Sequence, residues 1–295
     1  MKTALHSVSY AGVWRNQVCL CLGDFLVKAT SLGFDGVELM GKRPHLSPLD
    51  YGENELCKLK DRLDELSLEC ACVAGYTNFT AENGFIPALE MQLIYVDTLA
   101  RFASKLNCPI IRIFTGYANG APYWDQWNTC VISIRECCRR AAAYGVDIGI
   151  QNHHDIAVDP LSLAEFIDEV NEPNCKAMFD AWAPMTQGFD LADAVEQLAG
   201  KIAFTTVADY QKRPRFKYDP RLVNYERETD LLKAVPMGRG FIDYGKFFTA
   251  LKNIGYDGYV SYEMCSDLEG GGSETNLDYC AGEFVGYMRG ISVLA

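Results

Sequence analysis

The sequence predicts an α/β protein, a single-domain (β/α)8 TIM barrel over residues 1–295. Short apolar segments alternate with longer helical patterns eight times, roughly every 35 residues, as expected for strand–helix units in a parallel barrel. A length of 295 residues suits one such barrel. An open doubly wound sheet is the alternative, but the Gly-x-Gly-x-x-Gly turn that usually follows its first strand is not found.

Each unit is predicted from its own pattern. Apolar residues spaced three and four apart, such as Leu89, Leu93 and Val96, indicate helices, and short apolar runs indicate strands. Gly33 and Gly255 mark helix ends, where glycine supplies a left-handed cap. The expected strands are 3–8, 35–40, 69–75, 109–115, 147–152, 175–180, 202–208 and 258–263. The expected helices lie near 20–32, 53–67, 87–106, 126–144, 161–171, 190–199, 243–254 and 275–293.

The stretch 209–241, between the seventh and eighth strands, breaks this alternation. It is rich in aromatic, Arg and Lys residues and is interrupted by prolines, so we expect an irregular loop. A loop of this length in a compact barrel is usually a lid or a binding loop. We expect it to cover the barrel mouth or to contact another subunit.

The composition limits the class of protein. A net charge of −12 disfavours nucleic acid and anionic membranes as partners. No apolar run is long enough to span a membrane, and the first residues lack the apolar core of a secretory signal. The twelve cysteines are scattered without a Cys-x-x-Cys pair, which predicts reduced, buried thiols in a cytoplasmic protein.

Polar residues at the ends of the predicted strands are the candidate site residues, because these ends converge at the mouth of a barrel. They are Glu38, Arg112, Gln151, Asn152, His153, His154, Asp180, Thr206, Asp209 and Glu263. Asp180 and Glu263 each end an apolar strand, so each needs a partner such as a metal, a lysine or a substrate. His153 is either a proton carrier or a cap of the next loop, and His6 is either structural or a substrate contact.

Several motifs together resemble the xylose isomerase-like superfamily of sugar phosphate isomerases and epimerases. They are Gly33–Leu39, Ile150–His153, Met178–Asp180, and Val235–Asp243 leading to Gly255–Glu263. The last segment is the most specific, because its glycine turn, helix and Glu-ended strand occur at the spacing that the family shows. The resemblance extends over nearly the whole chain and implies a (β/α)8 barrel that acts on sugars.

The resemblance also implies a divalent metal held by a Glu, an Asp, a His and a Glu at the ends of strands five to eight. Asp180 and Glu263 match this pattern, whereas Gln151 replaces the first Glu and Thr206 replaces the His. Amide, hydroxyl and carboxylate oxygens would suit Mg²⁺ or Mn²⁺ better than Zn²⁺. We therefore expect a metal site at Gln151, Asp180, Glu263 and Thr206, with the two replacements placing the standard mechanism in question.

The expected activity is isomerisation or epimerisation of a keto-sugar or related polyol by metal-assisted removal of a proton next to a carbonyl. Glu263, His153 or Lys212 would move the proton. Trp182, Tyr210, Arg239 and His6 are the expected substrate contacts, with Trp182 as a flat wall for a sugar ring.

Two other classes of function stay open. One is a lyase or dehydratase acting on an oxidised sugar or inosose, and the other is a non-catalytic sugar-binding or partner subunit with a degenerate metal site. A multi-zinc endonuclease is disfavoured, because four histidines are too few for its ligands. The partner we expect is a small sugar or sugar derivative, and a homo-oligomer is possible.

Overall fold

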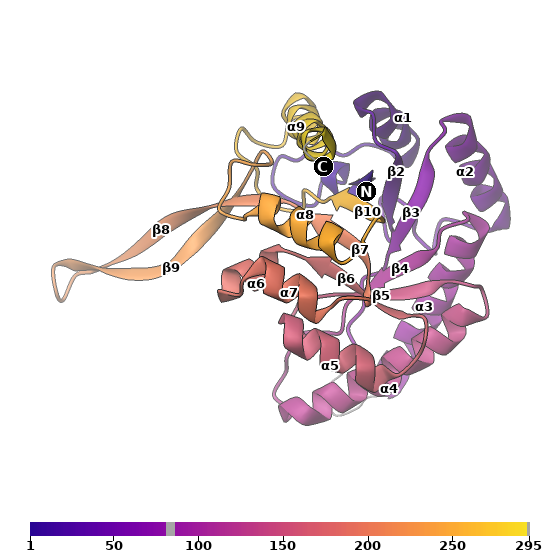
Figure 1. Cartoon of the computed structure of the whole chain (residues 1–295), viewed down its shortest axis with the longest axis horizontal. Coiled ribbons are helices and arrows are strands. Elements are labelled where there is room, and N and C mark those ends of the chain that lie inside the picture. The colour runs from indigo at the N-terminus through magenta and orange to yellow at the C-terminus, as the bar shows by residue number, and fades with distance from the viewer. Residues whose placement is uncertain (81–85, 294–295) are drawn as a thin grey trace.

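The computed structural model describes residues 1–80 and 86–293 and confirms the barrel. Eight parallel strands close in the order β1-β10-β7-β6-β5-β4-β3-β2, and helices surround them (Figure 1). The strands of the barrel are β1 (Lys2–His6), β2 (Gly36–Met40), β3 (Glu69–Ala74), β4 (Ile110–Ile113), β5 (Asp147–Gln151), β6 (Cys175–Asp180), β7 (Ile202–Val207) and β10 (Tyr259–Tyr262).

The helices follow the strands as expected, with local differences at their ends. They are α1 (Leu22–Leu32), α2 (Glu53–Glu65), α3 (Ile86–Lys105), α4 (Tyr123–Ala142), α5 (Pro160–Val170), α7 (Leu191–Gln197), α8 (Tyr244–Asn253) and α9 (Glu274–Val293). Two short helices were not predicted: the 3-10 helix η1 (Ser7–Tyr10), where the first strand was expected to continue, and α6 (Trp182–Gln187). Both follow directly on strand ends, where the chain turns at the barrel mouth.

Local sequence explains where several helices begin and end. Asp159 and Asp190 cap α5 and α7, since each side chain accepts hydrogen bonds from backbone N–H groups in the first turn. Gly33 ends α1 in the left-handed conformation, with φ of 82°. The cap at Gly33 agrees with the helix end expected from the sequence.

The main apolar core lies between the strands and the surrounding helices, and a smaller cluster fills the barrel itself. The second cluster comprises Ala4, Ala71, Cys72, Ile110, Met178 and Phe204. All twelve cysteines are free thiols, of which eight are buried and four are exposed, so the expectation of buried thiols holds for most of them. Within the part of the chain that the structure describes, no helix has the length and apolar character needed to cross a membrane.

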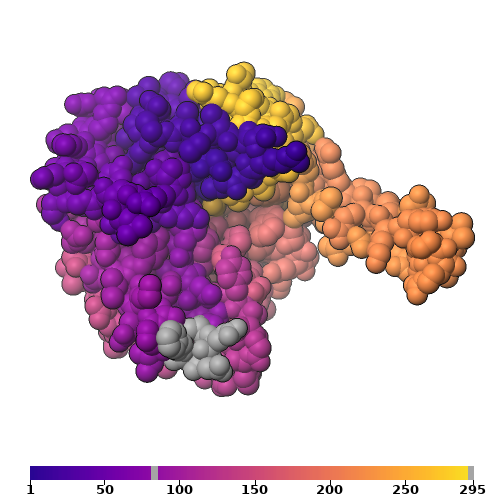
Figure 2. All heavy atoms as spheres, turned by 180° about the vertical axis from the view of Figure 1, so that it is seen from behind, coloured from indigo at the N-terminus to yellow at the C-terminus, as the bar shows by residue number. Residues whose placement is uncertain are grey.

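The expectation of an irregular loop at 209–241 is wrong. Residues 209–235 form a long antiparallel hairpin of β8 (Asp209–Asp219) and β9 (Asn224–Val235) that projects from the barrel (Figures 1 and 2). A shift in register between Arg213 and Arg215 accommodates Pro214, and Asp219 starts the turn at the tip by accepting a hydrogen bond from the Arg221 amide. The outer hairpin does not cover the mouth of its own barrel.

Candidate active site

Strand alternation builds a polar layer at one end of the barrel. Side chains two residues apart on a strand share a face, and three apolar residues of the inner cluster are followed on the same face by a polar residue nearer the strand end. Ile110 precedes Arg112, Met178 precedes Asp180, and Phe204 precedes Thr206. The polar residues therefore meet at the carboxyl ends of the strands, where barrel enzymes carry their active sites.

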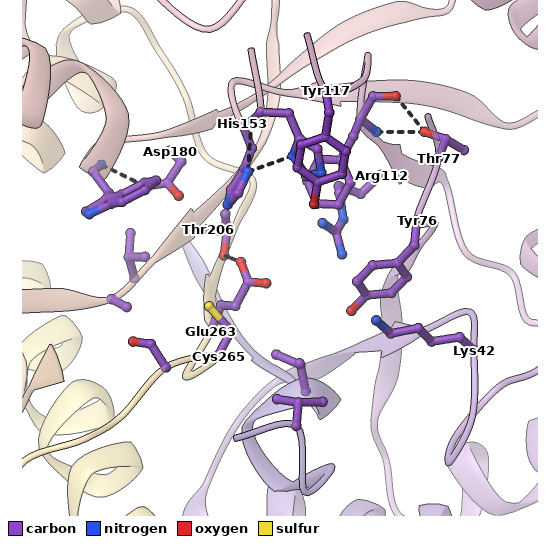
Figure 3. A pocket seen from close by; sticks show the side chains of 18 of the residues that line it. Lys42, Tyr76, Thr77, Arg112, Tyr117, His153, Asp180, Thr206, Glu263 and Cys265 are labelled. Carbon is purple, nitrogen blue, oxygen red and sulfur yellow. Dashed lines mark hydrogen bonds between the residues drawn. The ribbon is translucent and has the colours of Figure 1, made fainter. Parts of the chain in front are cut away.

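A cavity of about 650 Å³ opens onto this layer. Its polar side chains come from six or more strand ends and loops and converge on one space (Figure 3). The side chains that line it include Lys42, Tyr76, Arg112, His153, Asp180, Trp182, Thr206, Tyr210 and Glu263.

Glu263 directly follows β10 and points into the cavity (Figure 3). Its Oε2 accepts a hydrogen bond of 3.0 Å from the Thr206 hydroxyl. Burial alone would raise the pKa of this carboxyl, but the charge of Arg112 and the hydrogen bond from the Thr206 hydroxyl oppose burial, and the pKa is lowered. Glu263 is therefore ionised at neutral pH.

His6 is fully buried between two carboxylates. Its Nδ1 accepts a hydrogen bond from the Val8 amide, so the neutral ring carries its proton on Nε2. That nitrogen lies 3.4 Å from Glu38 Oε1 and 3.6 Å from Glu263 Oε1. Burial lowers the pKa of His6 to about 3, so the ring is neutral. His6 does not line the cavity and acts on it through Glu263.

Glu38 lies deeper in the barrel than Glu263 and is fully buried. Burial raises its pKa to about 8, and the charge of Glu263 adds to this effect while that of Arg112 opposes it. Glu38 is consequently neutral near pH 7. The neutral form avoids placing two like charges beside His6.

Arg112 is the central positive charge of the layer and is almost completely buried. Its guanidinium donates a hydrogen bond of 3.0 Å to Gln151 Oε1 and packs on the rings of Tyr76 and Phe114, with centroid distances of 4.7 and 4.2 Å. A buried guanidinium stays charged, because burial alone cannot deprotonate it at neutral pH. Arg112 thus supplies a permanent positive charge beside Glu263.

Asp180 ends β6 and is held from several sides. Its Oδ1 accepts a hydrogen bond of 2.7 Å from the Trp182 amide, and its Oδ2 lies 3.5 Å from Gln151 Nε2. Burial raises the pKa of Asp180 to about 7. At neutral pH this carboxyl is close to half protonated.

His153 lines the cavity beside Trp182. Its Nδ1 accepts a hydrogen bond of 2.8 Å from the His154 amide and lies 2.7 Å from His154 Nδ1. An acceptor at Nδ1 assigns the proton of the neutral ring to Nε2. Burial lowers the pKa of His153, so the neutral ring is the form at pH 7.

The sequence profile of the xylose isomerase-like TIM barrel family matches residues 26–281. The chain belongs to this family. The resemblance expected from the motifs is therefore confirmed.

Individual relatives of this xylose isomerase-like protein are distant. It is 22% identical to the L-ribulose 3-epimerase of Methylomonas sp. (strain DH-1), over 88% of this chain and 83% of the relative. It is 24% identical to the 2-oxo-tetronate isomerase of Haemophilus influenzae, over 87% of this chain and 91% of the relative. The expectation of an enzyme of the isomerase and epimerase type is thus supported at the level of the family.

Solved structures share the fold over the full length. A D-psicose 3-epimerase determined in the presence of D-fructose superposes with a TM-score of 0.77 at 17% identity, covering 99% of both chains. The probable 3-DHS dehydratase from Bacillus anthracis superposes with a TM-score of 0.71 at 19% identity, covering 100% of this chain and 98% of its own. At these identities, the comparisons establish the fold.

The four positions at which the resemblance places metal ligands do come together at the barrel mouth, but their donor set does not fit a divalent cation. Gln151 presents its only oxygen to the Arg112 guanidinium, and the Thr206 hydroxyl donates to Glu263. Asp180 and Glu263 are then the only carboxylates of the set, with a buried positive charge beside them. Among residues 1–80 and 86–293, no three His, Cys, Asp or Glu side chains are arranged so that they could hold a metal ion together.

The structure places some of the predicted substrate contacts in the cavity and others outside it. Trp182 and Tyr210 line the cavity. Arg239 lies on the surface, where it contacts the Tyr279 hydroxyl and Glu283. Lys212 lies outside the cavity with its ammonium over the Phe241 ring, at 4.5 Å from the centroid. Lys212 leaves the mouth on the outgoing strand β8, whereas Arg239 lies in the segment between the hairpin and α8.

Asp209, considered a strand-end candidate, has a structural position instead. Its Oδ2 accepts hydrogen bonds from the amides of Gly238 and Gly240, at 2.9 and 2.8 Å. It therefore ties the base of the hairpin to the segment that leads into α8.

Lys42 and Tyr76 line the cavity, although neither was among the candidates at the predicted strand ends. Lys42 follows β2 in a polar loop, and its ammonium lies 3.5 Å from the centroid of the Tyr76 ring. Both side chains point toward the space that Glu263 enters from the other side (Figure 3). Lys42 follows Glu38 by four residues, and reading the loop residues after each strand as well as the strand ends would have included it.

Proposed function

We propose that this protein is an isomerase or epimerase that removes a proton next to the carbonyl of a keto-sugar or related polyol. The observation that supports this proposal is the ionised Glu263 carboxylate in the same cavity as the cations Arg112 and Lys42. A base and a positive charge are the two groups that enolisation needs.

In this scheme Glu263 takes the proton from the carbon beside the carbonyl. The Thr206 hydroxyl holds Oε2 of that carboxylate and so orients it. Negative charge then develops on the carbonyl oxygen, and Arg112 and Lys42 stabilise it in a buried, low-dielectric site. His153, which carries its proton on Nε2, donates a hydrogen bond to the same intermediate, and the protonated Glu263 carboxyl returns the proton to it.

The walls of the cavity suit a sugar. Phe114, Tyr117, Trp182 and Tyr210 supply apolar surfaces for the C–H faces of a ring or chain. Lys42, Arg112, His153 and Asp180 supply polar partners for hydroxyl groups. No step of the scheme passes through a metal, because the donor set described above does not fit one.

A dehydratase is the second candidate, and one observation favours it. Asp180, with its pKa raised to about 7, is available in the protonated form to donate a proton to a leaving hydroxyl. The enediolate would then expel that hydroxyl from the adjacent carbon as water, re-forming the carbonyl and leaving a carbon–carbon double bond beside it. A fold neighbour of this class is the probable 3-DHS dehydratase.

Proton exchange in D2O, followed by NMR, tests the proposal directly. Metal-depleted protein is incubated with L-ribulose, D-psicose and D-tagatose, and deuterium incorporation next to the carbonyl is the expected result. The Glu263→Gln variant should lose at least ~100-fold in exchange rate, since a general base contributes about that much. The Lys212→Ala variant should exchange at the wild-type rate, because Lys212 lies outside the cavity.

The same samples separate the other classes of function. Formation of an unsaturated ketone, detected by ultraviolet absorbance, would identify the dehydratase. Binding of sugar by calorimetry without exchange or absorbance change would identify a non-catalytic sugar-binding subunit. Exchange that returns only after addition of Mn²⁺ would contradict the metal-independent scheme.

A further inference from the structure

The outer hairpin exposes apolar side chains that nothing in its own barrel covers. We call residues 211–233 the arm. Its apolar side chains Phe216, Tyr218, Leu222, Val223, Tyr225 and Leu231 are each between 49 and 78% exposed. An isolated two-stranded hairpin is marginally stable in water, so a surface that packs on the arm would stabilise it.

A second exposed apolar surface lies on α3 and α4. We call it the α3–α4 patch, formed by Ile86, Met91, Ile94, Tyr123 and Trp124, with exposed fractions between 43 and 69%. The first turns of both helices follow the carboxyl ends of β3 and β4, so the patch adjoins the barrel mouth. Tyr117, which is exposed and lines the cavity, lies between β4 and α4 and connects the patch to the rim.

The charges of the whole hairpin that carries the arm, residues 209–235, and of the rest of the chain are opposite. Residues 209–235 contain seven Lys and Arg against five Asp and Glu, a net charge of +2. The whole chain carries −12, which leaves −14 for the remainder. The arm is therefore attracted to the body of another copy of this chain.

Apart from Leu232, which lines the cavity at the base of the arm, the arm points away from its own barrel mouth (Figure 1). Asp209 accepts hydrogen bonds from the Gly238 and Gly240 amides, and Ala234 pairs with Leu268, which together direct the hairpin outward (Figures 1 and 2). An 11-residue strand spans about 36 Å at the usual rise per residue. That reach extends well past the edge of the barrel.

We propose that the arm of one copy lies across the barrel mouth of a second copy and packs on its α3–α4 patch. Each chain carries both surfaces, so the exchange is reciprocal and forms a closed two-fold dimer. Each cavity is then covered by the arm of the other copy. The proposal does not depend on the reaction proposed above, because its test measures association.

Sedimentation equilibrium of the full chain between about 1 and 100 μM tests this dimer. The wild type should sediment at twice the 32.9 kDa of one chain. The Phe216→Thr/Tyr218→Thr/Tyr225→Thr variant keeps strand-forming residues on the arm but removes its aromatic surface. It should weaken association at least 100-fold, as should Met91→Gln/Ile94→Gln on the patch. The control is Val27→Thr/Leu49→Thr, which removes two exposed apolar side chains away from both surfaces and should keep the wild-type mass.

Hydrogen exchange of the same proteins identifies the contact. In the arm variant, amides of residues 86–94 and 117–127 should exchange faster than in the wild type, and in the patch variant the arm amides should do so. A wild type that stays monomeric throughout the concentration range would overturn the proposal. So would a dimer that survives both variants, because its interface would then lie elsewhere.

Discussion

Glu263 and Arg112 show how single residues set the chemistry of the site. Arg112 is buried and Glu263 is partly buried at the strand ends, and their opposite charges keep the carboxylate ionised where burial alone would neutralise it. Glu38 lies on β2, four residues before Lys42 of the adjoining loop. Its protonation state is the opposite of that of Glu263, because burial raises the pKa of Glu38 to about 8. Neighbouring carboxyls with different protonation states allow one to act as a base while the other stays neutral.

A prediction at this scale concerns the two replaced ligand positions. Gln151→Glu alone should pair the new carboxylate with Arg112, because Gln151 Oε1 already lies 3.0 Å from that guanidinium. Gln151→Glu/Thr206→His together should create the ligand set that the family resemblance implies and bind Mn²⁺ at least 10-fold more tightly than the wild type. Titration calorimetry with Mn²⁺ measures this difference. Tight binding of one Mn²⁺ by the wild type would contradict this prediction, because it would show that the wild-type side chains already form a metal site.

Some secondary structure elements are determined by local sequence signals, and others by contacts between residues far apart in the sequence. The barrel strands and their helices follow from apolar periodicity and helix caps, which are local. The β8–β9 hairpin depends instead on contacts between residues far apart in sequence, above all on Asp209 and the amides of Gly238 and Gly240. Its orientation is decided at that base.

A prediction at the scale of elements tests the hairpin base. A Cβ atom at Gly240 would lie 1.9 Å from Asp209 Oδ1, so Gly240→Ala must displace the Asp209 side chain. We expect the variant to unfold several degrees lower in temperature and to be cut by trypsin faster within the arm. Gly245→Ala is the matched control, because its Cβ would have only an ordinary contact at 3.5 Å. Equal melting temperatures for the two variants would contradict the role of this base.

The buried carboxyls make one contribution to the pH dependence of stability, and the buried His6 and the partly buried His153, whose pKa values are lowered, contribute with the opposite sign. Glu38 has an ordinary pKa of 4.5 when unfolded and about 8 when folded, so the folded protein holds a proton that the unfolded chain has lost. Stability from this group is complete below pH 4.5 and falls as pH rises to 8. Asp180, raised to about 7, contributes with the same sign.

The corresponding prediction is a fall in the free energy of unfolding of roughly 1 kcal/mol per pH unit between pH 5.5 and 7.5 from Glu38 alone. Glu38→Gln should reduce that slope, because its side chain stays neutral at every pH. Urea denaturation at pH 5.5, 6.5 and 7.5 measures the slopes, with the exposed Glu196→Gln as control. A slope unchanged by Glu38→Gln would mean that Glu38 is ionised in the folded protein.

The sequence by itself determined the fold and the residues at the strand ends, because strand alternation and helix periodicity are encoded by near neighbours. It also placed Asp180, Gln151, Thr206 and Glu263 together at the mouth of the barrel. Their hydrogen bonds, and with them the mismatch to a metal, appeared only in three dimensions, since Arg112 reaches Gln151 from another strand.

Tertiary structure alone decided the rest of the site and the shape of the molecule. Lys42 enters the cavity from a loop whose path no local pattern encodes. Lys212 and Arg239 follow the seventh strand in sequence but lie outside the cavity, Lys212 over the Phe241 ring and Arg239 beside the Tyr279 hydroxyl on the surface. The physical reason is common to these cases: a side chain at a strand end is placed by the pleat of its own strand, whereas a side chain in a connection is placed by distant contacts.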